Sequence, residues 1–270
     1  MPSSLPVIRF GTLAVSHLRP ERLVHEVPLL FVHGAWCGKY QFENWIRFAA
    51  EQGWESYALD LRGHGESACE DFGNATIEDY AKDIETVVSE IGTSYVVGHS
   101  LGGLALQLAA SRSSLIRKAV LLASAPPAGI VAHYGFTGRV MSYFVEFFSR
   151  KPTPLKRSDV FRFLYSDPVA AQEFDFNALE SPRAVRDIGL WRIWVKRLPC
   201  PSLVVAGEED HATPLRAQRE IAKKYNSDYV QIPHIGHMLM LEKGWEKPIY
   251  EILRWLGEEE HDAINKGVRP

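Results

Sequence analysis

The sequence predicts an α/β fold with a mostly parallel central sheet. Short, continuous apolar runs recur along the chain, which is typical of strands that are buried on both faces. Segments with apolar residues at helical spacing lie between them, and after an N-terminal pair no hairpin signal joins two consecutive buried strands. A chain of 270 residues is long enough for one large domain, or for one domain that carries an insertion.

The first part of this pattern can be assigned element by element. Residues 7–18 alternate apolar and polar side chains and predict a pair of edge strands. Buried strands are expected at Leu29–Val32 and at Glu55–Asp60, and a glycine-rich loop follows the second one. Thr76 then begins a helix that Gly92 ends. The apolar face of this helix consists of Ile77, Tyr80, Ala81, Ile84, Val87, Val88 and Ile91.

The alternation continues in the middle of the chain and resumes near its end. The stretch "SYVVGHS" predicts a third buried strand, Leu101–Ala110 a helix, and "KAVLLASAPP" a fourth strand. Much later, "CPSLVVAGEED" predicts a strand that ends at Gly207. A helix at "PLRAQREIAKKY", a strand at "DYVQIPHIGH" and a closing helix at "WEKPIYEILRWLGEE" complete the pattern.

The interval between these two parts breaks the alternation. Residues 133–150 are rich in aromatic side chains at helical spacing, and residues 181–198 offer Ser181 as an N-cap with Pro182 at the first helical position. Because the sheet pattern continues afterwards, we interpret residues 126–198 as a helical cap. It is inserted into a core made of residues 1–125 and 199–270.

Composition excludes several classes of protein. The net charge of −3 and the pI of about 6.4 make nucleic acid a poor candidate partner. The three cysteines are scattered, so they predict a reducing compartment, no disulfide framework and no metal site, and no cofactor is expected. The N-terminus lacks the pattern of a secretory signal, and no apolar run approaches the roughly 20 residues of a membrane span. We therefore expect a cytoplasmic protein, whose oligomeric state the sequence does not indicate.

The stretch "VVGHSLGGLALQLAA" carries the strongest chemical signal. Gly98-His99-Ser100-Leu101-Gly102 matches G-x-S-x-G and lies between an expected strand and an expected helix. Glycines on both sides allow a sharp turn that lifts the serine hydroxyl clear of both elements. The amide of Leu101 then lies at a helix start, where donors are free and negative charge is favoured. Ser100 is predicted to be a nucleophile, and the alternative is a plain N-cap.

This sequence resembles the α/β-hydrolase family in five motifs that follow in the family's order. "VHGAW" resembles its oxyanion loop, "LDLRGHGES" the loop after the next strand, and "GHSLGG" its nucleophile elbow. "GEED" and "GHMLMLE" resemble its acid and histidine loops. The resemblance implies a triad of Ser100, Asp210 and His237, and an oxyanion hole made by the amides of Ala35 and Leu101.

Competing residues lie beside the predicted acid and base. Glu208 and Glu209 precede Asp210, and an acidic cluster is usually a solvated loop. His234 is the nearest competitor of His237, but the flexible glycine directly before His237 suits a ring that must reach a nucleophile. His99 is too close in sequence to Ser100, and His211 adjoins the acid, so neither is expected to be the base.

The reaction that these residues favour is acyl transfer. We expect a serine hydrolase that cleaves a carboxylic ester of a small, largely apolar molecule, in a pocket that includes Trp36, Phe136, Phe144 and Trp191. A core role for Trp36 is an equal alternative. A thioester, a lactone or a carbon–carbon bond remains open as substrate, and so does lyase or oxygenase chemistry without a cofactor. A hydrolase-like receptor for a small molecule is the alternative of another class.

Overall fold

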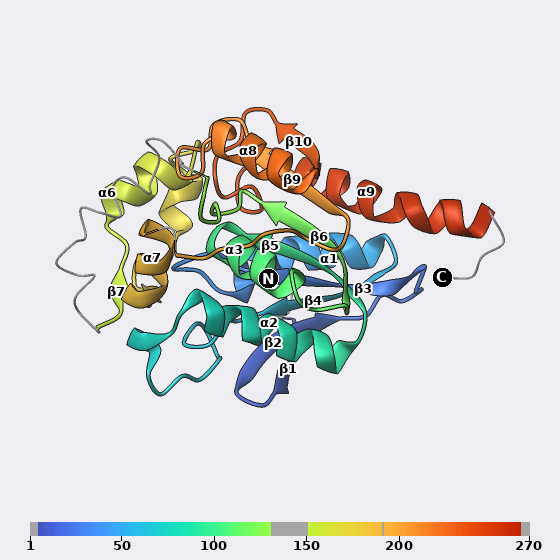
Figure 1. Ribbon diagram of the computed structural model, residues 1–270, viewed down its shortest axis with the longest axis horizontal. Coiled ribbons are helices and arrows are strands. Elements are labelled where there is room, and N and C mark those ends of the chain that lie inside the picture. Colours follow the sequence, from blue (N-terminus) through green and yellow to red (C-terminus); the bar gives the residue numbers. More distant parts are fainter. Residues whose placement is uncertain (1–4, 131–150, 191, 266–270) are drawn as a thin grey trace.

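The computed structural model describes residues 5–130, 151–190 and 192–265. It confirms the predicted α/β class with an eight-stranded sheet in the order β1-β2-β4-β3-β5-β6-β9-β10 (Figure 1). Only the pairings β1–β2 and β2–β4 are antiparallel; the other neighbours pair in parallel. The strands are β1 (Val7–Phe10), β2 (Leu13–Leu18), β3 (His25–Val32), β4 (Trp54–Leu59), β5 (Ser94–His99), β6 (Ile116–Leu122), β9 (Ser202–Gly207) and β10 (Asp228–Ile232).

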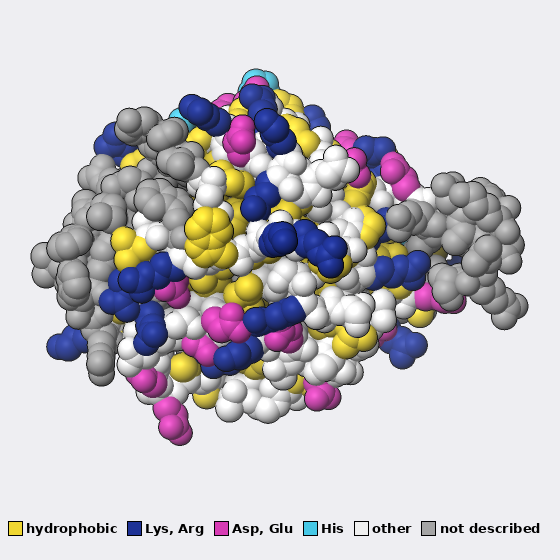
Figure 2. Space-filling view, viewed as in Figure 1, with side chains coloured by type: hydrophobic (Ala, Val, Ile, Leu, Met, Phe, Trp, Pro, Cys, Tyr) yellow, Lys and Arg dark blue, Asp and Glu magenta, His cyan; other side chains and the backbone are white. Residues whose placement is uncertain are grey.

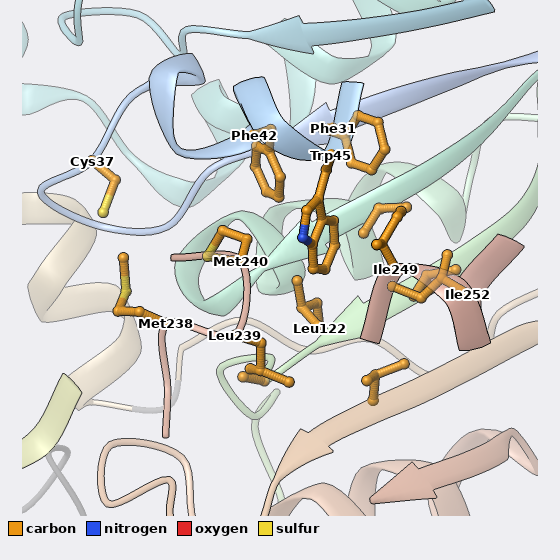
Figure 3. Close-up of a cluster of buried hydrophobic side chains, with 14 of the residues drawn as sticks. Phe31, Cys37, Phe42, Trp45, Leu122, Met238, Leu239, Met240, Ile249 and Ile252 are labelled. Atoms are coloured by element: carbon orange, nitrogen blue, oxygen red, sulfur yellow. The ribbon is translucent and has the colours of Figure 1, made fainter. Parts of the chain in front are cut away.

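Helices cover both faces of this sheet. They are α1 (Glu43–Glu51), α2 (Ile77–Ile91), α3 (Ser100–Ala110), α8 (Leu215–Tyr225) and α9 (Glu246–Asn265). Side chains alternate along each parallel strand, so Phe31 joins a core with α1 and α9, whereas Leu30 joins a core with α2, α3 and α8. In the first of these cores Phe31 and Trp45 lie near Ile249 and Ile252 (Figure 3). Burial on both faces explains why the parallel strands read as continuous apolar runs.

The predicted boundaries of α2 are confirmed in atomic detail. The Thr76 hydroxyl accepts a hydrogen bond from the Asp79 amide, and the Asp79 carboxylate accepts one from the Thr76 amide. The helix ends at Gly92, whose φ of 84° favours glycine. Helix α1 was not expected from the sequence, although its buried Trp45, Ile46 and Ala49 are spaced as one helical face.

The segment between β6 and β9 contains more than helices. Residues 133–150, where a helix is expected, lie outside the described ranges. Ser181 accepts hydrogen bonds from the amides of Arg183 and Ala184, as an N-cap does, but α7 ends at Gly189 and residues 192–198 have irregular backbone. A short antiparallel ribbon of β7 and β8 was not expected. The elements are β7 (Thr153–Pro154), α6 (Arg157–Asp159), a π-helical turn η4 (Val160–Leu164), a 3-10 turn η5 (Ala170–Glu173), β8 (Leu179–Glu180) and α7 (Pro182–Gly189).

The surface carries both signs of charge. Lys and Arg side chains are interspersed with Asp and Glu on the face shown in Figure 2, in keeping with a net charge of only −3. Across the described ranges, no helix combines the length and the apolar character that crossing a bilayer requires.

The parallel strands bring their loops to one edge of the sheet. β3, β5, β6, β9 and β10 run in the same direction, so the loops at their carboxyl ends lie side by side. The predicted oxyanion, serine, acid and histidine loops all follow strands of this set. Binding sites of open parallel sheets lie at that edge.

Candidate active site

Ser100 occupies a tight turn between β5 and α3. Its φ is 51°, in the left-handed region that a serine rarely adopts. A β-carbon at Gly98 would lie 2.7 Å from the carbonyl oxygen of Gly102, and one at Gly102 would lie 2.2 Å from the carbonyl oxygen of His33. Both distances are too short for any side chain. The two glycines of the motif are therefore required by the close packing of this turn on itself and on the loop after β3.

Asp210 follows β9 and is held by donors from its own loop. Its Oδ1 accepts hydrogen bonds of 2.8 Å from the amides of Ala212 and Thr213. Its Oδ2 lies 2.7 Å from the Thr213 hydroxyl and 2.8 Å from His237 Nδ1. The carboxyl side chain is 1% exposed, so these groups replace water around it. The carboxylate is thus aimed at one histidine by a local turn.

His237 follows β10 and is fixed through both its ring and its backbone. Its amide donates to the Leu164 carbonyl at 3.0 Å, and its own carbonyl accepts a hydrogen bond of 3.0 Å from His99 Nε2. With Nδ1 directed at Asp210, Nε2 is on the opposite side of the ring. Among the described residues, no protein group hydrogen-bonds to this nitrogen or to the Ser100 hydroxyl. Such contacts often form fully only when substrate is bound.

The loop after β3 runs directly against the serine. A β-carbon at Gly34 would lie 2.9 Å from the β-carbon of Ser100, so only glycine allows this approach. The next residue, Ala35, and Leu101 at the start of α3 both border the same cavity as Ser100. Within the described part of the chain, neither amide donates to another protein group. Two free donors therefore lie beside the serine.

Two buried histidines near the serine are held in the neutral form. Burial, with the neighbouring His64 adding to it, lowers the pKa of His33 to about 4. His33 Nδ1 donates to the Gly34 carbonyl at 2.8 Å, and its Nε2 accepts from the Leu61 amide at 3.0 Å, which leaves no room for a second proton. Burial also lowers the pKa of His99 well below its ordinary value. Both neutral rings hold neighbouring loops in place through hydrogen bonds at their two nitrogens.

The cavity next to Ser100 is lined mostly by apolar side chains. Trp36 lies on its wall and is 5% exposed, so it serves the pocket and the core at once. The other predicted pocket residues, Phe136, Phe144 and Trp191, lie outside the described residues. Among the described residues, the lining comprises Ala35, Trp36, His99, Ser100, Leu101, Ala125, Pro126, Leu164, Val185, Ile188, Ala212, Thr213, His237 and Met238.

The competing acidic and histidine residues lie elsewhere. His234 is 85% exposed at its side chain, and its Nδ1 is 3.6 Å from the carboxylate of the half-exposed Glu209. Glu208 is exposed and accepts from the His234 amide. His211 is exposed as well. The structure therefore places His237, paired with Asp210, on the cavity that Ser100 borders, and leaves these residues on the surface.

Several residues around the site were not singled out from the sequence. The amide and the hydroxyl of Thr213 both donate hydrogen bonds to the Asp210 carboxylate. A threonine three residues after an aspartate is a turn signal, so the sequence could have identified Thr213. Glu242 accepts hydrogen bonds from the Gly236 amide at 3.2 Å and so supports the histidine loop. Gln41 donates to His99 Nδ1 at 3.3 Å. No local pattern marks Gln41, because its partner is distant in sequence, whereas Glu242 lies only six residues after Gly236.

One of the three cysteines is buried near the oxyanion loop. Cys37 is buried close to the oxyanion loop, and burial raises the pKa of its thiol, in keeping with a packing role. All three cysteines are free. Among the described residues, no three or more His, Cys, Asp or Glu side chains lie together so that they could hold a metal ion.

The fold is that of an α/β-hydrolase. A model of the alpha/beta hydrolase family matches residues 29–247, and the chain therefore belongs to that family of enzymes. This match spans all four loops described above and the segment between β6 and β9.

Relatives and solved structures agree with this membership. The chain is 25% identical to a non-heme haloperoxidase of Rhodococcus erythropolis over 226 residues, which are 72% of this chain and 79% of that protein. It is 35% identical to the esterase Rv0045c of Mycobacterium tuberculosis over 103 residues, which are 37% of this chain and 34% of that protein. The structure of an esterase from Thermogutta terrifontis has a TM-score of 0.71 at 20% identity, covering 91% of this chain and 94% of that one. These similarities support a hydrolase of the α/β class.

Proposed function

We propose that this protein is a serine hydrolase that cleaves carboxylic esters of a small, largely apolar acyl group through an acyl-enzyme on Ser100. The observation that carries the proposal is that Ser100, in its strained turn, and the Asp210-bound His237 border a single cavity. Strained backbone at a nucleophile is a recurrent feature of active sites. The resemblance to proteins named as esterases supports the same reaction class.

The roles of the three side chains follow from their chemistry. Ser100 Oγ attacks the carbonyl carbon of the ester while His237 Nε2 takes the hydroxyl proton. Asp210 holds the ring with Nδ1 protonated and stabilises the imidazolium that forms. The tetrahedral intermediate then expels the alcohol, which receives its proton from His237. Water attacks the acyl-enzyme with His237 again as base, and the carboxylic acid leaves with Ser100 restored.

The negative oxygen of the tetrahedral intermediate needs donors in fixed positions. The amides of Ala35 and Leu101 supply them, and the Leu101 amide adds the favourable field at the start of α3. Removing one such donor typically costs about 2.7–4 kcal/mol of transition-state stabilisation.

The substrate class follows from the cavity lining. Ten of its fourteen described residues are apolar, and the polar ones are Ser100, Thr213 and the two histidines. A neutral, apolar acyl group fits such a lining, because burying a charge there without a partner is costly. Leu164, Val185 and Ile188 come from the segment between β6 and β9. This placement supports residues 126–198 as a cap over the cavity of a core made of residues 1–125 and 199–270.

Active-site labelling and an ester series test the proposal. A fluorophosphonate should form an adduct at Ser100 that is detected by mass spectrometry, and Ser100→Ala should abolish both the adduct and ester turnover. Ser114→Ala, in an exposed turn before β6, is the matched control and should change neither. Among aryl esters of graded chain length, kcat/KM should rise beyond acetate, because each buried CH₂ adds roughly 0.8 kcal/mol. Labelling without turnover of esters, thioesters or lactones would instead indicate a receptor.

A further inference from the structure

A second histidine–carboxylate cluster lies under the oxyanion loop. Glu180, on β8, is 0% exposed, and its carboxylate accepts four hydrogen bonds. Oε1 accepts from the Tyr80 hydroxyl at 2.6 Å and from the Ser181 amide at 2.7 Å. Oε2 accepts from His64 Nε2 at 3.1 Å and from the Trp36 amide at 3.3 Å. Glu180 does not line the cavity, but it reaches the residue directly after Ala35.

The carboxylate is held in its charged form. Burial alone would raise the pKa of Glu180, but the charge of His64 and the hydrogen bonds from His64, Tyr80 and Ser181 outweigh it and hold the pKa below its ordinary value. Burial likewise opposes protonation of His64, yet Glu180 raises the pKa of His64. An ionised acceptor binds an amide about twice as strongly as a neutral one does. The Trp36 amide thus has a strong partner.

Trp36 is a residue whose backbone needs such a partner. Its φ is 55°, a conformation that a bulky side chain adopts only when its surroundings impose it. Its indole Nε1 also donates to the Thr153 carbonyl at 2.8 Å. Thr153 and Glu180 are directly opposite each other in the β7–β8 ribbon. The β7–β8 ribbon therefore accepts hydrogen bonds from both the backbone amide and the indole of Trp36.

These two hydrogen bonds to the β7–β8 ribbon bear on which amide of the oxyanion loop faces the serine. The amides of Ala35 and Trp36 are successive donors in one loop, and rotation of the peptide unit between them would turn the Trp36 amide away from Glu180 and reorient the Ala35 carbonyl with it. Glu180 commits the Trp36 amide to the ribbon and leaves the Ala35 amide free. We infer that Glu180 is a positioning residue, by which the segment between β6 and β9 fixes the geometry of the oxyanion loop. This inference rests on the proposed function.

The test compares the two oxygens of Glu180. In Glu180→Gln the charge is lost and one oxygen becomes an NH₂ group, so one of the two main-chain amides loses its acceptor and the other keeps only a neutral, weaker one. We expect kcat for an aryl ester to fall by about 10- to 100-fold, while KM changes by less than about threefold. Affinity for a trifluoromethyl ketone, which forms a tetrahedral adduct on the serine, should fall in parallel, whereas affinity for the matching secondary alcohol should not change.

Tyr80→Phe is the matched control, because the Tyr80 hydroxyl binds the oxygen that does not face Trp36. It should lower the melting temperature but leave kcat near the parent value. Parent-like kcat and ketone affinity in a folded Glu180→Gln variant would overturn the inference, and so would an equal loss of kcat in Tyr80→Phe. If Glu180→Gln does not fold, Trp36→Phe removes the indole contact with Thr153, and the ketone-to-alcohol affinity ratio should fall. An unchanged ratio would overturn the inference. Turnover by Ser100→Ala would refute the proposed function itself, a different result from any of these.

Discussion

The molecule contains two buried histidine–carboxylate pairs of almost equal geometry and different environments. His237 Nδ1 lies 2.8 Å from Asp210 Oδ2, with side chains that are 3% and 1% exposed. His64 Nε2 lies 3.1 Å from Glu180 Oε2, with side chains that are 2% and 0% exposed. Burial and a charged partner therefore do not distinguish the two pairs.

The second ring nitrogen does distinguish them. His64 Nδ1 is 3.2 Å from the Arg62 carbonyl, so both nitrogens of this ring are committed to protein acceptors. The other nitrogen of His237 has no such partner within the described residues, and its ring borders the cavity of Ser100. A histidine can move protons to and from a substrate only through an uncommitted nitrogen. The comparison predicts that one pair serves turnover and the other serves stability and positioning.

The largest expected effect is that of His237→Ala on turnover. Loss of the general base should lower kcat for an aryl ester by about 10⁴- to 10⁶-fold, because the serine hydroxyl then has no proton acceptor. The midpoint of urea unfolding should fall as well, because the buried Asp210 carboxylate loses its histidine partner. His234→Ala, on the surface, is the control and should keep most of the activity. If His234→Ala were the inactive variant, the base would be assigned to the wrong histidine.

Asp210→Asn should have the next largest effect. The amide would favour the wrong tautomer of His237 and would not stabilise the imidazolium, so kcat should fall by about 10⁴-fold. Steady-state kinetics at saturating ester measure this loss. Glu209→Gln alters the neighbouring carboxylate, which is 46% exposed at its side chain, and should have almost no effect on kcat. Comparable losses in both variants would contradict the separate roles of these carboxylates.

His64→Ala should destabilise the fold while retaining far more turnover than His237→Ala. It leaves the charge of Glu180 buried without its partner, which typically destabilises a protein by about 3–5 kcal/mol. Urea unfolding followed by circular dichroism measures this free energy. The double variant His64→Ala with Glu180→Gln should recover part of the loss, because the unpaired charge is gone. The contrast between the two pairs would be contradicted if His64→Ala lowered kcat as much as His237→Ala does and left the free energy of unfolding unchanged.

The smallest effect concerns pH and the buried His33, whose ring lies against that of His64. The folded protein lowers the pKa of His33 from 6.5 to about 4. Between these values the unfolded chain binds a proton that folded His33 does not accept, so stability should fall as the pH falls from 6.5 towards 4. Over the whole interval this amounts to about 3 kcal/mol.

A variant isolates this contribution from other groups. Burial raises the pKa of Asp83, Asp187 and Glu242, which therefore act in the opposite direction as the pH falls. The difference in unfolding free energy between the parent and His33→Gln, measured at pH 7, 6 and 5, removes their effect. This difference should shrink as the pH falls. A difference that stays constant would mean that His33 becomes protonated in the folded state.

Local patterns were sufficient for the elements that position the serine. Continuous apolar runs predicted the parallel strands, because residues on both sides of such a strand are buried. The capping pattern at Thr76 predicted the start of α2, because capping bonds join residues only a few positions apart. The motif around Ser100 predicted its sharp turn for the same reason. The short β7–β8 ribbon escaped prediction, since two-residue strands carry no periodicity.

The sequence by itself thus determined the α/β class, the order of the strands along the chain and the turn that presents Ser100. The resemblance to the family already pointed to Asp210 and His237, but only the tertiary structure shows that these two side chains face each other while His234 faces solvent, and that Glu180 accepts from the Trp36 amide. The Glu180–Trp36 hydrogen bond joins residues 144 positions apart. A short-range sequence pattern predicts the backbone conformation of the residues that form it. Contacts between distant segments depend on how the sheet and the segment between β6 and β9 pack together, and no local pattern encodes that packing.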